Sequence, residues 1–182
     1  GVFFDKELVT NTEKWGTASL TSGSFGQTFK LTPLQLVRAI ASVVNGGYLL
    51  EPYVVSEVVD ADGNTVLKQE PTVIRQVISE ETSATVRECL EFVVAQGTGK
   101  NGQVAGYRIG GKTGTADKTG TDDVVVSFMC FAPADDPQIA IAIYVEKGAQ
   151  GGNLGQIARA MLDVYFAEDS TTPQIITENT VQ

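Results

Sequence analysis

The sequence predicts an α/β (α+β) sandwich in which helices pack on an antiparallel sheet. Three strand-like segments follow one another at residues 107–115, 124–131 and 139–145. Short connections join these segments, and short connections are typical of antiparallel neighbours. Helical segments with one apolar face stand before and after the strands, and such a face is buried against another element.

The N-terminal part of the chain is predicted to be irregular until the first clear helix. Residues 1–26 contain a cluster of Gly, Ser and Thr and are expected to form a loop. Thr32 is a good N-cap, Pro33 suits the first helical position, and Gln35 completes a capping box. The helix is expected to end at the Asn-Gly-Gly of residues 45–47, and its apolar face consists of Leu34, Val37, Ile40, Ala41 and Val44.

The middle of the chain is predicted to contain a hairpin and a second helix. Residues 53–59 and 65–68 are expected to be the two arms of the hairpin, and residues 73–77 another short extended piece. Ser79 is the predicted N-cap of the second helix, which Gly97 ends. Its expected buried face consists of Val86, Leu90, Val93 and Val94.

The C-terminal part is predicted to add a covering helix and a tail. Residues 139–143 alternate Ile and Ala, as in a strand that is covered on both faces. A last helix is expected at about residues 154–166, and residues 167–182 are expected to be a mobile tail. One side of that helix is formed by Leu154, Ile157, Ala158, Met161 and Tyr165.

Composition excludes several classes of function. The chain has 182 residues and a net charge of −9, which argues against a nucleic-acid partner, since a phosphate-binding face needs clustered Lys and Arg. There is no His, and we expect no metal site and no cofactor. Cys89 and Cys130 lie in apolar runs and are expected to be buried and unbridged. No apolar stretch reaches the roughly 18 residues of a membrane span.

One short motif stands out, Gly111-Lys112-Thr113-Gly114-Thr115-Ala116. Lys112 supplies a positive charge, Thr113 and Thr115 supply hydroxyl donors, and Gly114 lets another backbone come close. On a strand edge these groups suit a peptide substrate that ends in a carboxylate. K-T-G is also one of three motifs of the serine acyl-transferases that react with β-lactams, beside S-x-x-K and S-D-N.

The two companion motifs are missing. No Ser of the chain has Lys three places on, and none has Asn two places on. The sequence therefore predicts a piece of an enzyme that holds a substrate-binding strand without a recognisable nucleophile.

Two other interpretations fit the same residues. Gly106 and Gly111-Lys112-Thr113 match the P-loop formula of nucleotide-binding proteins. A P-loop needs a buried strand before it and a helix that starts at the Lys, and neither residues 100–105 nor the segment after Thr113 has that character. An ordinary edge strand with a solvated Lys is the second alternative.

Several motifs, in one order between residue 23 and about residue 166, together resemble the transpeptidase domains of penicillin-binding proteins. Gly26-Gln27 followed by Thr32-Pro33 is closer to the monofunctional class B type than to the bifunctional class A type. The motifs are Ser24-Phe25-Gly26-Gln27, Leu31-Thr32-Pro33-Leu34-Gln35-Leu36, Asn45-Gly46-Gly47, Gly97-Thr98-Gly99, the K-T-G segment and Phe131-Ala132-Pro133-Ala134-Asp135-Asp136-Pro137.

The resemblance implies an incomplete penicillin-binding/serine β-lactamase-like fold, with residues 1–166 as the C-terminal portion of the domain. Family members cross-link peptidoglycan stem peptides at their D-Ala-D-Ala end through an acyl-serine, and β-lactams trap that serine. They are bitopic membrane proteins whose catalytic region is extracytoplasmic. A non-catalytic sensor module of the same fold stays an alternative, and a D,D-carboxypeptidase or a β-lactamase fits the motifs less well.

The resemblance also assigns roles and a partner surface. Lys112 would tune the field and protonation around the nucleophile, and Thr113 and Thr115 would hold the substrate or drug carboxylate. The backbone N–H of Thr115 would be one of two oxyanion-hole donors. Gly26, Gln27, Thr32 and Pro33 are interpreted as scaffold. In the family sheet the segment 139–145 pairs on its far side with a strand that this chain lacks, so self-association through that edge is expected.

Overall fold

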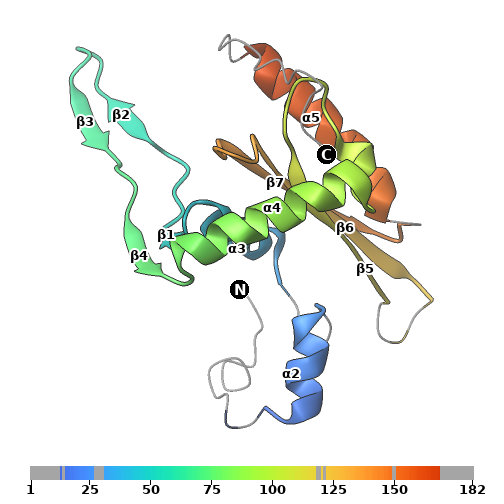
Figure 1. The fold of residues 1–182 in the computed structure, drawn as a ribbon. Coiled ribbons are helices and arrows are strands. Elements are labelled where there is room, and N and C mark those ends of the chain that lie inside the picture. Colours follow the sequence, from blue (N-terminus) through green and yellow to red (C-terminus); the bar gives the residue numbers. More distant parts are fainter. Residues whose placement is uncertain are drawn as a thin grey trace.

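The computed structural model describes residues 13, 15–26, 31–117, 120, 122–148 and 151–168. Figure 1 shows how the elements are arranged. The helices and strands are α2 (Thr17–Ser24), α3 (Pro33–Val44), β1 (Tyr48–Leu50), β2 (Glu57–Val59), β3 (Thr65–Lys68), β4 (Val73–Gln76), α4 (Glu80–Gln96), β5 (Gly110–Asp117), β6 (Val124–Ala132), β7 (Ile139–Glu146) and α5 (Leu154–Glu168), with short 3₁₀ turns η2 (Lys100–Gly102) and η3 (Gly151–Asn153).

The central sheet has three antiparallel strands in the order β5-β6-β7, which confirms the predicted fold class. Lys112 of β5 lies opposite Met129 of β6, and Met129 lies opposite Ala142 of β7. The first strand begins at Gly110 rather than at the predicted residue 107. Tyr107 instead stacks on Phe166 of α5, with ring centroids 3.6 Å apart.

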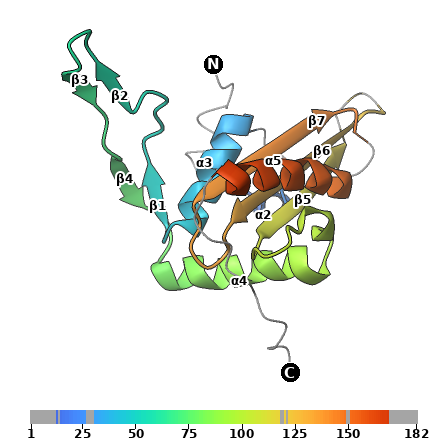
Figure 2. The ribbon, with the colours of Figure 1, turned by 90° about the horizontal axis from the view of Figure 1, so that it is seen from above.

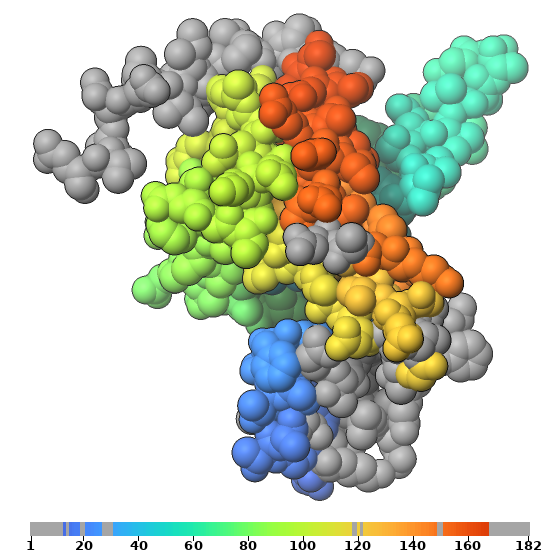
Figure 3. Space-filling model, turned by 90° about the vertical axis from the view of Figure 1, so that its right-hand side faces the viewer, coloured from blue at the N-terminus to red at the C-terminus, as the bar shows by residue number. Residues whose placement is uncertain are grey.

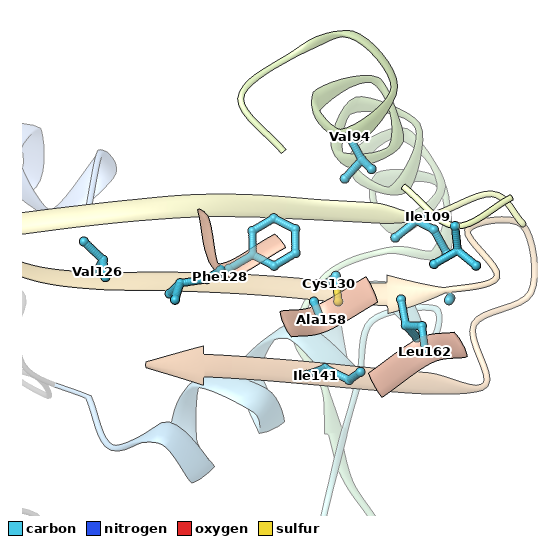
Figure 4. Packing of buried hydrophobic residues seen from close by; sticks show 11 residues of the cluster. Val94, Ile109, Val126, Phe128, Cys130, Ile141, Ala158 and Leu162 are labelled. Carbon is cyan, nitrogen blue, oxygen red and sulfur yellow. The ribbon is translucent and has the colours of Figure 1, made fainter. Parts of the chain in front are cut away.

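One face of the sheet packs against α5. Alternate residues of β6 point to this face, and Phe128 and Cys130 are fully buried there. Figure 4 shows Ala158 and Leu162 of α5 beside this row of side chains, with Val94 of α4 and Ile109 in the same cluster. This cluster is the larger of the two parts of the core.

The opposite face packs against α3. Phe131, also fully buried, joins Ile40 and Val44 of α3 in a second cluster, against which Ala140 of β7 packs. The isoleucines of β7 pack against the first cluster, so the predicted covering of this strand on both faces is confirmed.

The two central helices begin where their capping residues predict. Thr32 accepts a hydrogen bond from the backbone N–H of Gln35, whose side chain accepts from the backbone N–H of Thr32. Ser79 caps α4 in the same way by accepting from the N–H of Thr82. Both predicted starts are confirmed.

α4 is joined to the end of α3 by a buried hydroxyl that the sequence pattern did not reveal. Ser83, which has no exposed surface, donates to the carbonyl oxygen of Val43 at 2.6 Å and accepts from the N–H of Gly46 at 3.1 Å. Of the four residues predicted for the buried face of α4, only Val94 is buried, with 1% of its surface exposed. The buried stripe of α4 is therefore partly polar.

Ion pairs join α4 to the chain just before β5. Arg108 donates twice to the carboxylate of Glu91, with both distances 2.6 Å, and lies 3.8 Å from Asp135 in the β6–β7 turn. The hydrogen bonds to Glu91 raise the pKa of Arg108 above its ordinary value. The N–H of Ala134 donates to the carbonyl of Arg108, which ties the same turn to the start of β5.

The hairpin projects from the body of the molecule as an arm, visible in Figures 2 and 3. β2 pairs with β3, while β1 pairs with β4 at the base of the arm. The prediction of a strand over residues 53–59 is wrong for its first four residues, because only Glu57–Val59 pairs. Val54, in that unpaired part, is fully exposed.

Three further expectations are corrected by the structure. Part of the segment expected to be a loop is the helix α2, whose Thr21 and Ser24 hydroxyls donate to backbone carbonyls of their own helix. Cys89 is exposed on α4, whereas Cys130 is buried as expected, and both are free. On α5, Ile157 and Met161 are about half exposed, because the stripe that packs on the sheet is Leu154, Ala158 and Leu162. Most of the predicted tail lies outside the described residues.

Candidate functional site

The K-T-G segment lies in the middle of β5, at one edge of the sheet. Lys112, Thr113, Gly114 and Thr115 pair with β6 on one side, and β5 has no second neighbour among the described strands. In Figure 2 α4 passes beside the start of this strand. The sequence therefore predicted correctly that the segment is an edge strand.

Strand alternation divides the motif between the two faces of the sheet. Thr113 and Thr115 lie opposite Phe128 and Val126, whose side chains point to the face covered by α5. Lys112 lies on the other face, in the same row as Gly110 and Gly114. A ligand that lies along the free edge of β5 can meet groups from both faces.

Lys112 is exposed and lies along the free side of its strand. Its Nζ donates to the backbone carbonyl of Thr113 at 2.7 Å. From this contact we infer that the polar backbone groups of Thr113 point away from β6. Because N–H and C=O of one residue point to the same side of an antiparallel strand, the N–H of Thr115 points to the free side as well.

The hydroxyl of Thr113 has a partner that the sequence analysis did not identify as part of the site. Thr98, in the turn that follows α4, places its Oγ1 2.9 Å from Oγ1 of Thr113. The signal available in the sequence was the Gly97-Thr98-Gly99 motif, which had no assigned role. Thr98 and Thr113 are 15 residues apart, so only the folded chain brings them together.

The glycines of the segment are sites of close packing. A side chain at Gly111 would lie 2.6 Å from the carbonyl oxygen of Met129, and one at Gly114 would overlap the hydroxyl of Ser127. Gly151 of η3 packs as tightly, since a side chain there would lie 2.6 Å from the carbonyl oxygen of Gly114. The strand is therefore held in place by contacts that leave no room for larger residues.

Three other chemistries are disfavoured. β5 runs as a strand through Lys112 to Asp117, so no helix begins at Lys112 and the P-loop interpretation is wrong. Cys130, opposite Gly111, is a poor nucleophile because burial raises the pKa of its thiol to about 12. In the part of the chain that the structure describes, no cluster of His, Cys, Asp and Glu could hold a metal ion.

Comparison with known proteins decides the family. Residues 4–163 match the family described as "Penicillin binding protein transpeptidase domain". The chain belongs to this family. The resemblance found in the sequence is confirmed, and the relatives support the class B type.

Two curated relatives illustrate the match to penicillin-binding proteins. "Stage V sporulation protein D" of Bacillus subtilis is 46% identical over 153 residues, which cover 81% of this chain and 23% of that protein. "Peptidoglycan D,D-transpeptidase MrdA" of Acinetobacter baumannii is 32% identical and covers 92% of this chain. The chain spans about a quarter of the length of these two relatives, 23% and 27%.

A solved structure agrees with the sequence relatives. Penicillin-binding protein A of M. tuberculosis, in a complex titled an imipenem acyl-enzyme, has a TM-score of 0.73 and 30% identity. The match covers 83% of this chain and 34% of that chain. The fold described here is thus a portion of a penicillin-binding transpeptidase fold. In the described part of the chain, none of the helices has the length and apolar character needed to cross a membrane.

Proposed function

We propose that the protein containing this chain is a serine-type peptidoglycan D,D-transpeptidase that cross-links stem peptides and is acylated by β-lactams. The observation that carries this proposal is a K-T-G segment on the free edge of the sheet in a chain of the transpeptidase family. The chain supplies the substrate-binding strand and contains no S-x-x-K. Relatives named D,D-transpeptidase and an acyl-enzyme structure support the same reaction.

The proposed roles follow the position of each group on β5. Lys112 brings a positive charge to the free edge, where it tunes the protonation of the nucleophilic serine. Thr113 and Thr115 bind the carboxylate of the D-Ala-D-Ala end or of the drug with their hydroxyls. Gly114 leaves space for the peptide backbone, and the N–H of Thr115 serves as one oxyanion-hole donor.

The proposed location is the extracytoplasmic face of the bacterial cell membrane, because the stem peptides are there. We propose no nucleic-acid partner, because the net charge is −9. A non-catalytic sensor of β-lactams or peptides is the second candidate, favoured only if the complete protein lacks S-x-x-K or S-x-N.

We predict that the 182-residue chain by itself is not acylated by penicillin, whereas the full-length protein is. The reason is that the covalent bond needs the activated serine of an S-x-x-K motif, and no S-x-x-K is present in the sequence. The measurement is labelling with a fluorescent penicillin, followed by a denaturing gel. A labelled band at the mass of the chain that is absent when the protein is boiled before labelling would contradict the proposal, and so would an unlabelled full-length protein.

We also propose that the chain self-associates through the edge strand β7. Among the described strands, β7 pairs only with β6, and an unpaired row of N–H and C=O groups is a template for another strand. The helix α5, which packs on the same sheet, exposes 48% of Ile157 and 47% of Met161, and exposed apolar surface favours association.

Light scattering at increasing concentration is expected to show an average mass that rises above 19.3 kDa. The physical reason is that pairing of two β7 strands satisfies backbone groups that otherwise face solvent. A constant monomer mass together with slow hydrogen exchange along Ile139–Glu146 would show that the edge is covered within the chain, and the proposal would be wrong.

A further inference from the structure

A hydroxyl pair lies beside the proposed substrate-binding strand. Oγ1 of Thr98 and Oγ1 of Thr113 are 2.9 Å apart, and either atom can be the donor in this hydrogen bond. Thr113 belongs to the proposed carboxylate site, whereas Thr98 has no role in the function proposed above.

The backbone of the turn around Thr98 is fixed by its two flanking glycines. The N–H groups of Gly97 and Gly99 both donate to the carbonyl oxygen of Val93, at 3.0 Å and 3.1 Å. A side chain at Gly97 would lie 2.8 Å from that same oxygen. The turn therefore presents Thr98 from a rigid end of α4.

Contacts with η3, just before α5, hold the same turn from the other side. The Asn101 side chain donates to the carbonyl oxygen of Gly152 at 3.1 Å, and Gly152 also packs against the carbonyl of Thr98. Gln103 donates to the carbonyls of Val94 and Ala95 at the end of α4. The turn that carries Thr98 is thus fixed by contacts with the backbone of both η3 and α4.

The chemistry of the ligand sets the direction of the hydrogen bonds. An ionised carboxylate can only accept, so Thr113 must use its single hydroxyl proton to bind it. The proton between the two threonines must then come from Thr98. A hydrogen bond received by Thr113 also polarises its own O–H and strengthens the bond that it donates.

We propose that Thr98 is a positioning residue that holds the Thr113 hydroxyl with its proton directed to the substrate carboxylate. This inference rests on the proposed function, in which Thr113 binds that carboxylate. Thr98 itself does not touch the substrate. Thr98 acts by fixing one rotamer of Thr113 and by donating a hydrogen bond to Oγ1 of Thr113.

The test uses a full-length transpeptidase that contains this segment and compares benzylpenicillin with its methyl ester, which lacks the charged carboxylate. Thr98→Val removes the hydroxyl and keeps the shape, and it is expected to slow acylation by benzylpenicillin roughly fivefold, the effect of one lost hydrogen bond. Acylation by the ester is expected to stay as in the wild type. Thr98→Ser keeps the hydroxyl and is expected to restore most of the rate.

A matched control and a double variant complete the design. Thr85→Val removes a hydroxyl that donates to Glu81 within α4, away from the site, and both rates are expected to stay unchanged. Thr113→Val is expected to slow acylation by benzylpenicillin, the free acid, and to leave acylation by the methyl ester unchanged. The double variant Thr98→Val/Thr113→Val is expected to be no slower than Thr113→Val, because Thr98 acts only through Thr113.

The outcomes separate this inference from the proposed function. If Thr113→Val is slow with the acid while Thr98→Val equals the wild type, the role of Thr98 is refuted and the carboxylate site stands. If Thr98→Val slows acid and ester equally, its role is structural and the inference is overturned. If Thr113→Val leaves the acid reaction unchanged, the carboxylate site is wrong and the role of Thr98 is overturned with it.

Discussion

Replacing Lys112 with Ala in the full-length transpeptidase is expected to slow acylation by benzylpenicillin by about a hundredfold or more, the size of effect typical of a lost electrostatic contact in an acyl-transfer site. The ammonium lies on the free side of β5, where it donates a hydrogen bond to the carbonyl of Thr113 at 2.7 Å. There it can favour the deprotonated nucleophile and the negative charge that develops during attack. Stopped-flow or gel-based acylation rates provide the measurement.

The fold of the Lys112→Ala variant is expected to survive, because the side chain is exposed and lies outside both core clusters. Lys68→Ala is the matched control, since Lys68 is an exposed lysine on a strand of the projecting arm, 3.3 Å from Glu70. Its acylation rate and melting temperature are expected to equal those of the wild type. A Lys112→Ala variant with a normal acylation rate refutes the role of Lys112.

Features that depend on a few neighbouring residues could be predicted from the sequence. The start of α3 needs only Thr32, Pro33 and Gln35, which interact within one turn. The order of β5, β6 and β7 follows from their short connections and from the apolar pattern of each strand. The K-T-G segment could be placed on a strand edge from its own residues and from the family resemblance.

Features that depend on distant contacts could not be predicted in this way. β1 has only three residues, too few to show a hydrophobic alternation, and its partner β4 lies at the other end of the projecting arm in the sequence. In the sequence Ser83 is an ordinary polar helix residue, and its burial depends on contact with the distant end of α3. The hydrogen bond between Thr98 and Thr113 likewise arises only because the turn after α4 lies against β5.

The glycine that begins β5 shows how packing positions the site. Gly110 pairs with Phe131, which is fully buried between the sheet and α3. A side chain at Gly110 would overlap the ring of Phe131, so no Cβ fits while that ring keeps its place. Lys112 follows two residues later on the same face of the strand. The sequence displays the two glycines before K-T-G but not the ring that requires one of them.

We therefore expect Gly110→Ala to lower the free energy of unfolding of the chain by about 1–3 kcal/mol, the usual cost of overpacking a core. The direction of the change in the free energy of unfolding is informative, because a Gly→Ala change at an unstrained site stabilises the protein by roughly 0.4–1 kcal/mol through the unfolded state. Gly23→Ala in α2, where a side chain meets nothing within 4 Å, is the control and is expected to cause no loss. Urea unfolding followed by circular dichroism measures all variants.

A second substitution tests the cause of that loss. Phe131→Leu shortens the side chain that the new methyl group meets, so Gly110→Ala is expected to cost less in its presence than in the wild type. The coupling is specific to this pair because the ring of Phe131 supplies all three of the nearest atoms. Equal costs of Gly110→Ala in both backgrounds, or a variant as stable as the wild type, would show that the strand can shift at Gly110, and the packing argument for the position of Lys112 would fail.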